Sequence, residues 1–207
     1  MSAIAPRLVL ATHNAHKVTE LRAILAPLLA GLDPVDLVGA RDLGAPEPVE
    51  DGLTFAANAL LKARALAAFT GLPALADDSG LSVDVLGGAP GIFSARWAGR
   101  HGDDAANLDL LLAQLEDIAA ENRGARFTCA AALVTPAGAE HVEIGHLVGR
   151  LALAARGTGG FGYDPVLVPD GQTRTCAEHT PAEKNAISHR GQAFRALAPA
   201  IAVALGR

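Results

Sequence analysis

Two strand-like segments joined by a short turn lie in the middle of the sequence and limit the folds that it can adopt. Arg126–Thr135 and Glu140–Arg150 read as long strands, and the Pro136–Gly138 segment between them is typical of a hairpin turn. On either side of this hairpin, apolar runs alternate with helical patterns, an order typical of α/β proteins. The sequence therefore predicts an α/β fold with a mixed, twisted sheet.

Short apolar runs predict the other strands. They are expected at Arg7–Ala11, Val35–Val38, Leu72–Ala76 and Leu81–Leu86. The polar segment Asp77–Gly80 separates the last two runs. We therefore interpret Asp77–Gly80 as the end of one strand, from which the chain continues into the next strand.

Apolar residues spaced three and four positions apart predict amphipathic helices. The expected starting points are Asn14, Thr54, Asp103 and Ser188. The helix from Thr54 is expected to end near Phe69, because Gly71 follows it. A capping box at Thr180–Glu183, with proline at the first helical position, predicts one more helix start.

Charge, length and cysteine content exclude several classes of protein. The chain has 207 residues and a formal net charge of −5, whereas proteins that bind nucleic-acid polymers usually present a basic face. No stretch is long and apolar enough to span a membrane, and no signal peptide is indicated. Without a linker or repeat, we expect a single domain over residues 1–207. Cys129 and Cys176 form no metal-binding pattern, which favours a reduced, cytoplasmic setting.

The segment from Thr12 to Lys17 joins a predicted strand to a predicted helix. It holds a hydroxyl, an amide and an ammonium group at a helix start, where backbone N–H groups can bind an anion. Two interpretations stay open from these residues alone. Either they bind phosphate oxygens, or Asn14 only caps the helix and Lys17 is only a solvated side chain.

Three carboxylates are candidates for a metal site. Neighbouring strand residues point to opposite faces, so one of Asp77 and Asp78 can face a binding site while the other supports the loop. Glu50, in an acidic loop before the second helix, is a candidate second ligand. Mg²⁺ typically takes one or two carboxylates together with substrate phosphates and water. The alternative is that the paired aspartates only form a turn.

A glycine-rich loop at Gly157–Asp164 is a candidate for base recognition. Glycine allows a backbone to approach a ligand closely, and either Phe161 or Tyr163 could stack on a planar base.

A second polar group surrounds the last predicted helix start and consists of Lys184, Ser188, His189 and Arg190. Arg190 offers a planar fork of donors that suits a carbonyl or a phosphate. His189 is a candidate general base, although a lone histidine is more often structural.

Five segments together resemble one family, the non-canonical purine nucleoside triphosphate pyrophosphatases, also called inosine triphosphate or dITP/XTP pyrophosphatases. In chain order they are ATHNAHK (11–17), EDGLTFAANALLKA (50–63), ALADDSGLSVDVLGGAPGIFSARWAG (74–99), GTGGFGYDP (157–165) and EKNAISHRGQA (183–193). The resemblance extends from about Arg7 to about Leu205, and the third segment is very specific.

The resemblance implies a reaction and an architecture. The reaction is Mg²⁺-dependent hydrolysis of a purine nucleoside triphosphate (ITP, dITP or XTP) to the monophosphate and pyrophosphate, which clears these nucleotides from the pool that supplies DNA and RNA synthesis. The architecture is a homodimer of chains with an elongated mixed sheet, flanking helices, and two lobes around a central nucleotide-binding cleft. No membrane or nucleic-acid polymer is expected as a partner.

The resemblance also implies roles for matching residues. Asp78 is expected to accept the proton of the attacking water and, with Glu50, to bind the metal. The triphosphate is expected to contact Thr12, His13, Asn14, Ala15, His16, Lys17, Lys62 and Ser79. The base and sugar are expected to contact Phe161, Gly162, Tyr163, Asp164, Lys184, His189 and Arg190. His13 and His16 stand where many members of the family carry glycine, which makes the first loop bulkier.

Overall fold

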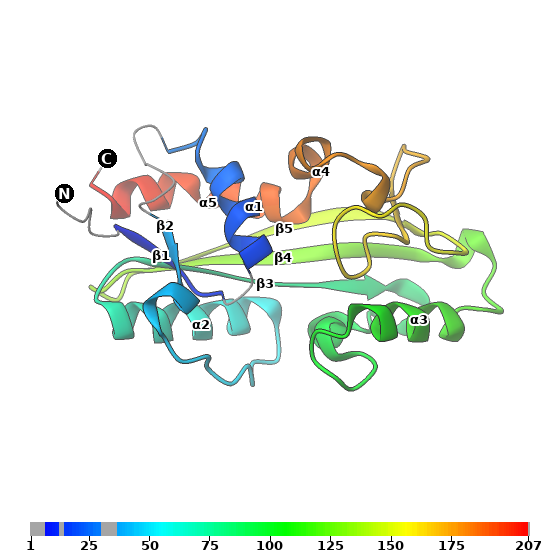
Figure 1. Ribbon diagram of the computed structural model, residues 1–207, viewed down its shortest axis with the longest axis horizontal. Coiled ribbons are helices and arrows are strands. Elements are labelled where there is room, and N and C mark those ends of the chain that lie inside the picture. Colours follow the sequence, from blue (N-terminus) through cyan, green and yellow to red (C-terminus); the bar gives the residue numbers. More distant parts are fainter. Residues whose placement is uncertain (1–6, 13–14, 30–36, 207) are drawn as a thin grey trace. The chain divides into compact units, whose positions relative to one another are not determined.

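The computed structural model describes residues 7–12, 15–29 and 37–206, whose strands form one mixed six-stranded sheet in the order β2-β1-β3-β4-β5-β6 (Figure 1). β1 pairs in parallel with both β2 and β3, whereas β5 pairs antiparallel with β6. The expected α/β fold with a mixed sheet is therefore confirmed. The strand bounds are β1 (Leu8–Leu10), β2 (Leu37–Gly39), β3 (Ala74–Val83), β4 (Gly124–Val134), β5 (Glu140–Leu151) and β6 (Leu167–Pro169).

The helices begin and end where local cap chemistry predicts. The Thr54 hydroxyl accepts a hydrogen bond from the Ala57 amide at the start of α2, and Gly71 ends that helix with a φ of 68°. The capping box between Thr180 and Glu183 is present at the start of α4. The helix bounds are α1 (Ala15–Leu25), α2 (Phe55–Thr70), α3 (Asp104–Gln114), α4 (Pro181–Ile187) and α5 (His189–Ala204).

The chain divides into two compact units. Unit 1 consists of the described part of Met1–Asp78 with Cys129–Gly145 and Arg190–Arg207, and unit 2 consists of Ser79–Thr128 and His146–His189. Strands β3, β4 and β5 each contribute residues to both units.

Unit 1 buries apolar side chains on both faces of its strands. Alternation along β1 sends Leu8 and Leu10 into one cluster and Val9 into another. The first cluster packs against α1 and α5 through residues such as Leu21 and Phe194, and the second packs against α2 through small residues such as Ala63. Figure 1 shows α1 and α5 on one side of these strands and α2 on the other. The alanine-rich α2 therefore packs closely under the strands that position the acidic residues.

Unit 2 has one apolar cluster of its own. Leu111 of α3 and Leu115, which follows the helix, are fully buried in one cluster with Leu81 and Val83 of β3. Tyr163 joins this cluster, so the glycine-rich loop is attached to the core of unit 2 by an aromatic side chain.

The polar segment Asp77–Gly80 does not end a strand, so that part of the sequence-based interpretation is wrong. β3 runs without a break from Ala74 to Val83, and Asp84–Leu86 form a 3₁₀ turn rather than the end of a further strand. In the described part of the chain, β1 pairs with β3 only at Ala74 and Leu75, so the segment stays extended because β3 continues in the sheet beside β4. The two aspartates bond to other side chains and therefore do not compete for their own backbone.

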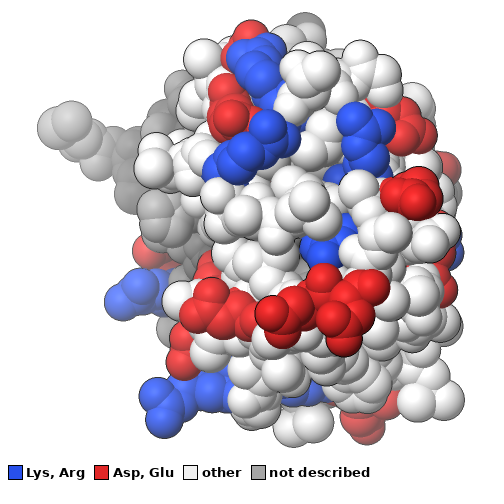
Figure 2. All heavy atoms as spheres, turned by 90° about the vertical axis from the view of Figure 1, so that its right-hand side faces the viewer, with Lys and Arg blue, Asp and Glu red and all other residues white. Residues whose placement is uncertain are grey.

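The second strand begins at Leu37, inside the expected range, while Val35 and Asp36 lie outside the described residues. Within the described ranges, no helix is long and apolar enough to cross a membrane. Acidic side chains form a band across the face shown in Figure 2, and the basic side chains described there lie in separate groups. That face therefore lacks the continuous basic area that a nucleic-acid polymer requires.

Candidate active site

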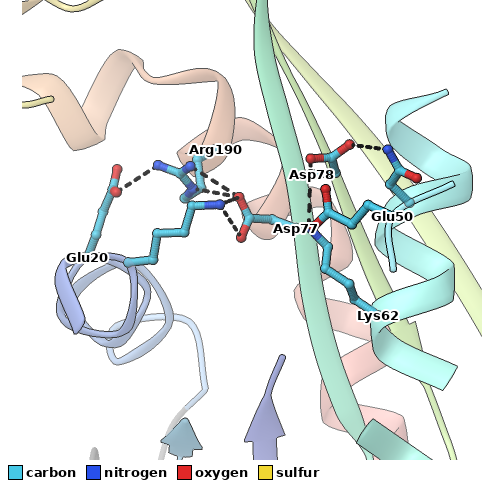
Figure 3. Close-up of polar contacts among 8 residues, drawn as sticks. Glu20, Glu50, Lys62, Asp77, Asp78 and Arg190 are labelled. Carbon is cyan, nitrogen blue, oxygen red and sulfur yellow. Dashed lines mark hydrogen bonds and ion pairs between the residues drawn. The ribbon is translucent and has the colours of Figure 1, made fainter. Parts of the chain in front are cut away.

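Asp77 and Asp78 project from opposite faces of β3 into two different groups of charged residues, both in unit 1 (Figure 3). Asp77 points toward Arg190, and Asp78 points toward α2, which carries Lys62. The alternation follows directly from strand geometry and agrees with the expectation that the two carboxylates serve different purposes.

Asp77 is the centre of a buried ion network. Its carboxylate accepts hydrogen bonds from Lys17 Nζ at 3.2 Å and from Arg190 Nε and Nη2, both at 3.1 Å. Arg190 Nη1 donates to Glu20 Oε2 at 2.7 Å. Burial alone would raise the pKa of Asp77, but the positive charges of Lys17 and Arg190 outweigh it and hold that pKa far below its usual range. Asp77 is therefore an ionised anchor for two cations.

Glu50, Lys62 and Asp78 form the second group. Lys62 Nζ lies 2.7 Å from Glu50 Oε1 and 3.7 Å from Asp78 Oδ1. Burial alone would lower the pKa of Lys62, but the carboxylates of Asp78, Asp77 and Glu50 raise it, so the ammonium stays charged.

The pKa of Asp78 shifts in the opposite direction to that of Asp77. Burial raises the pKa of Asp78 above its ordinary value, although Lys62 and a hydrogen bond from Asn58 oppose this rise. A raised pKa makes the ionised carboxylate a stronger base, as a proton acceptor in catalysis requires.

The donor set of Glu50 and Asp78 fits a magnesium ion that is shared with a substrate. The two carboxylates converge on one positive group, the Lys62 ammonium, and offer hard oxygen atoms. Within the described ranges, no three or more His, Cys, Asp and Glu side chains form a group that could hold a metal. Two carboxylates suit Mg²⁺ nevertheless, because this ion usually keeps several waters and takes its other ligands from phosphates.

The first loop follows β1, which runs parallel to β3 with Leu10 opposite Leu75. β1 ends at Leu10, after which the Ala11 amide donates to the Leu75 carbonyl at 2.7 Å and the Thr12 amide donates to the Leu10 carbonyl at 2.8 Å. Lys17 reaches Asp77 from the first turns of α1. His13 and Asn14 lie outside the described residues, and the side chains of Ala15 and His16 are not described either. Their expected phosphate contacts stay predictions.

The glycine-rich loop in unit 2 is held by Asp164. Its Oδ2 atom accepts hydrogen bonds from the Phe161 amide at 2.7 Å and from Lys184 Nζ at 2.6 Å. Gly160 has a φ of 71°, and a Cβ atom there would lie 2.1 Å from Asp164 Oδ2, so this position requires glycine. The Gly162 amide donates to Asp104 Oδ2 at 3.0 Å.

Of the two aromatic candidates, the structure exposes Phe161 and buries Tyr163. Phe161 is 40% exposed, with Lys184 Nζ 4.9 Å from its ring centroid. Tyr163 is 5% exposed, and its hydroxyl donates to the Ser94 carbonyl at 2.9 Å. Phe161 is therefore the ring that a planar base can reach.

The polar residues around the last helix start have different partners. Lys184 bonds to Asp164, and His189 stacks on Phe127 with ring centroids 4.9 Å apart. Arg190 belongs to unit 1, where its guanidinium bonds to Asp77 and Glu20 and is 2% exposed. The expected contact between Arg190 and a base stays a prediction, and this geometry does not support it. Ser79, the residue after Asp78, is half-buried in the unit 2 part of β3.

Two residues in these groups were given no site role from the sequence. Asn58 bonds to Asp78, and Glu20 bonds to Arg190. Asn58 lies one helical turn from Lys62 on α2, so the shared face was a usable signal for it. Glu20 and Arg190 are 170 positions apart, a separation at which no local pattern indicates contact.

The chain is similar to known proteins of one family. The model of the Ham1 family matches residues 8–200. A dITP/XTP pyrophosphatase from Streptomyces coelicolor is 69% identical over 201 residues, covering 97% of this chain and 99% of that protein. A dITP/XTP pyrophosphatase from Bifidobacterium longum is 50% identical, covering 94% and 98% of the two chains.

Two solved structures share the fold. A nucleoside-triphosphatase / dITP/XTP pyrophosphatase from Mycobacterium abscessus has a TM-score of 0.73 at 51% identity, with 93% of this chain and 98% of that chain covered. A HAM1 protein from Coxiella burnetii has a TM-score of 0.84 at 40% identity, with 95% and 98% covered. With a matching sheet, a near-complete match to the family model and relatives of this identity, the chain belongs to the Ham1 family.

Proposed function

We propose that this protein hydrolyses inosine- and xanthosine-type nucleoside triphosphates (ITP, dITP and XTP) to the monophosphate and pyrophosphate. The relatives named dITP/XTP pyrophosphatase support this substrate class. The observation that carries the proposal is the Asp78 carboxylate, whose pKa burial raises and which lies beside Lys62 and Glu50. By removing these triphosphates, the protein would keep them out of DNA and RNA.

Asp78 acts in this proposal on the attacking water. Its carboxylate orients the water and accepts its proton as the oxygen attacks the α-phosphorus. The bond between the α-phosphorus and the bridging oxygen breaks, and the electron pair leaves with pyrophosphate. The carboxylate that performs this step accepts a hydrogen bond from Asn58 and forms an ion pair with Lys62.

The triphosphate and the leaving pyrophosphate carry charge that must be offset. Lys62 provides a buried cation beside Asp78, and Lys17 provides another, held by Asp77. Bound Mg²⁺, with Glu50 and Asp78 as its protein ligands, would add positive charge at the phosphates and polarise a phosphoryl oxygen. These residues are assigned to the phosphate end of the nucleotide.

Phe161 and Lys184 are assigned to the base end of the nucleotide. The exposed Phe161 ring offers a stacking surface, and Lys184 beside it offers a charged donor. Inosine and xanthosine present a 6-oxo acceptor to such a donor, whereas adenine presents a 6-amino donor. A site built to donate at this position rejects the base that cannot accept.

We also propose that residues 1–207 form a single domain, that the protein is a homodimer and that it is located in the cytoplasm. Cys129 and Cys176 are both buried and unbridged, which supports a reducing compartment. Light scattering during size-exclusion chromatography tests the dimer.

A turnover panel tests the proposed function. Purified protein with Mg²⁺ is given ITP, dITP, XTP, ATP, GTP, CTP and UTP in turn, and pyrophosphate is assayed separately from phosphate. We expect selective pyrophosphate release from the first three. Turnover of a different triphosphate would agree with the proposed mechanism but contradict the proposed substrate class. Binding of a triphosphate without turnover of any of the seven would contradict the proposed enzymatic function.

A further inference from the structure

The side chain of Asn58 in α2 connects two separate parts of the proposed active site. Its Oδ1 atom accepts a hydrogen bond from the Gly52 amide at 2.8 Å, and its Nδ2 atom donates to Asp78 Oδ2 at 3.1 Å. Asn58 is 1% exposed, so both bonds are shielded from water. The Gly52 backbone N–H can only donate, which fixes Oδ1 toward Gly52 and Nδ2 toward Asp78.

Gly52 belongs to the acidic loop that carries Glu50, two residues earlier. A Cβ atom at Gly52 would lie 2.5 Å from Asn58 Oδ1 and 2.9 Å from Ala57 Cβ. The close approach of this loop to α2 therefore requires glycine at this position and an acceptor on Asn58. The next residues, Leu53 and Thr54, lead directly into the α2 cap.

We propose that the Asn58 amide is a positioning group for the reaction, which holds the Glu50 loop and the Asp78 carboxylate in one fixed arrangement. The two carboxylates come from a loop and a strand, and both are drawn to the Lys62 ammonium. A cation attracts carboxylates but does not fix their orientation, whereas an amide with one donor and one acceptor directed at different partners does. The expected effect of Asn58 on turnover rests on the proposed function. The tether that Asn58 forms between the Glu50 loop and Asp78 does not.

Other side chains of similar size at position 58 would each lose part of this arrangement. Aspartate keeps an acceptor for Gly52, but replaces the donor to Asp78 with a second carboxylate oxygen, which repels the Asp78 carboxylate or shares a proton with it. Leucine fills a similar volume and loses both bonds. Asn107 in α3 provides a matched control, since it is also 1% exposed, accepts from the Ala98 amide at 2.7 Å and donates to the Ala95 carbonyl at 3.2 Å.

The first measurement is amide hydrogen exchange at Gly52 in the protein without nucleotide or metal. We expect Asn58→Leu to accelerate this exchange on the order of tenfold, while Asn58→Asp and Asn107→Leu leave it unchanged. Unchanged exchange in Asn58→Leu would overturn the proposed tether, whether or not the protein proves to be an enzyme.

The second measurement is steady-state turnover of ITP by the same variants. Asn58→Leu and Asn58→Asp should each lower kcat on the order of 10- to 100-fold with little change in KM, because the two hydrogen bonds of the Asn58 side chain go to Gly52 and Asp78, which are not among the residues assigned to the triphosphate or the base. Asn107→Leu should keep the wild-type kcat. Wild-type kcat in Asn58→Asp would overturn the proposed orientation of Asp78, and an equal loss in Asn107→Leu would reduce the effect to general destabilisation.

Gly52→Ala disrupts the same hydrogen bond between the Gly52 amide and Asn58 Oδ1 by changing its donor residue. This variant replaces Asn58→Leu in the test if Asn58→Leu does not fold. The added methyl group displaces the amide, so kcat should fall as in Asn58→Leu. A wild-type kcat for Gly52→Ala would contradict the proposal.

Discussion

Asp77 and Asp78 are adjacent residues of β3, yet their pKa values move in opposite directions. Burial raises the pKa of both carboxyl groups. At Asp77 the charges of Lys17 and Arg190 prevail over burial, and at Asp78 burial prevails over Lys62 and Asn58. Two neighbouring carboxylates are thereby separated into an ionised structural anchor and a stronger base, a division that is common where acid–base chemistry occurs.

Titration of the two carboxyl groups should show this division directly. In metal-free protein, ¹³C NMR of the side-chain carboxyl groups should place the pKa of Asp78 above the ordinary value of 3.8 and that of Asp77 well below it. Lys62→Met should raise the pKa of Asp78 further, because it removes a positive charge 3.7 Å from Oδ1. An unshifted Asp78 in both proteins would contradict the assignment.

Asp78→Asn should remove turnover and keep the fold. Asparagine has nearly the same shape but accepts no proton from water, so kcat for ITP should fall about 10²–10⁴-fold. Nucleotide binding, measured by calorimetry, should persist. Asp84→Asn, next to the end of β3 and in an ion pair with Arg126, is the control and should keep full activity. Comparable turnover by Asp78→Asn and the wild type would disprove the role of Asp78.

Asp77→Asn should act mainly on stability. It replaces one of the two carboxylate partners of the Arg190 guanidinium, which is 2% exposed, with a neutral amide, while Glu20 stays in place, so the cost in the free energy of unfolding is at most about 3–5 kcal/mol. Because the pKa of Asp77 is lowered on folding, its stabilisation is complete above the unfolded pKa and is lost as the pH falls below it. Urea unfolding between pH 6 and pH 3 should therefore show a shallower loss of stability in Asp77→Asn than in the wild type, and equal slopes would contradict this account.

Structural features that depend on interactions between residues close together in the chain were predictable from the sequence. Helix α2 begins after Thr54 and ends before Gly71 as expected, because a side-chain cap and a left-handed glycine act within a few residues. The path of Asp77–Gly80 was not predictable in this way. Its composition indicates a turn, but pairing within the sheet keeps it extended, and that pairing involves residues far away in the chain.

In the candidate site, too, local motifs were predictable from the sequence and long-range partners were not. The proximity of Asp78, Lys62 and Glu50 agrees with the motifs that contain them. Arg190 was grouped with Lys184 and His189 by sequence proximity, yet its guanidinium bonds to Asp77, 113 positions away. At the start of α5, the side chains of neighbouring residues point in different directions. Proximity in the sequence therefore did not indicate the partner of Arg190.

Phe161→Ala should weaken nucleotide binding with little effect on stability. The ring is 40% exposed, and loss of base stacking costs about 1–3 kcal/mol, which corresponds to a rise in KM for ITP of roughly 5- to 150-fold. Phe93→Ala is the matched control, because Phe93 is 50% exposed and also has a cation, Arg96, over its ring at 5.3 Å. Equal effects of both substitutions on KM would show that Phe161 has no specific role.

Glu50→Gln should change the magnesium requirement more than the fold. Glu50 is one of two proposed protein ligands, and the amide of glutamine is neutral and binds Mg²⁺ less tightly than a carboxylate. The Mg²⁺ concentration for half-maximal turnover should rise by about tenfold or more, since even changes outside the ligand shell can alter metal affinity that far. Lys62 Nζ, 2.7 Å from Glu50 Oε1, would lose a charged partner, so nucleotide binding without metal should be kept or strengthened as this ammonium turns to the phosphates. Glu47→Gln, in the same loop, should leave the magnesium dependence unchanged. If Glu50→Gln keeps the wild-type magnesium dependence, Glu50 is not a ligand and its role is confined to holding Lys62.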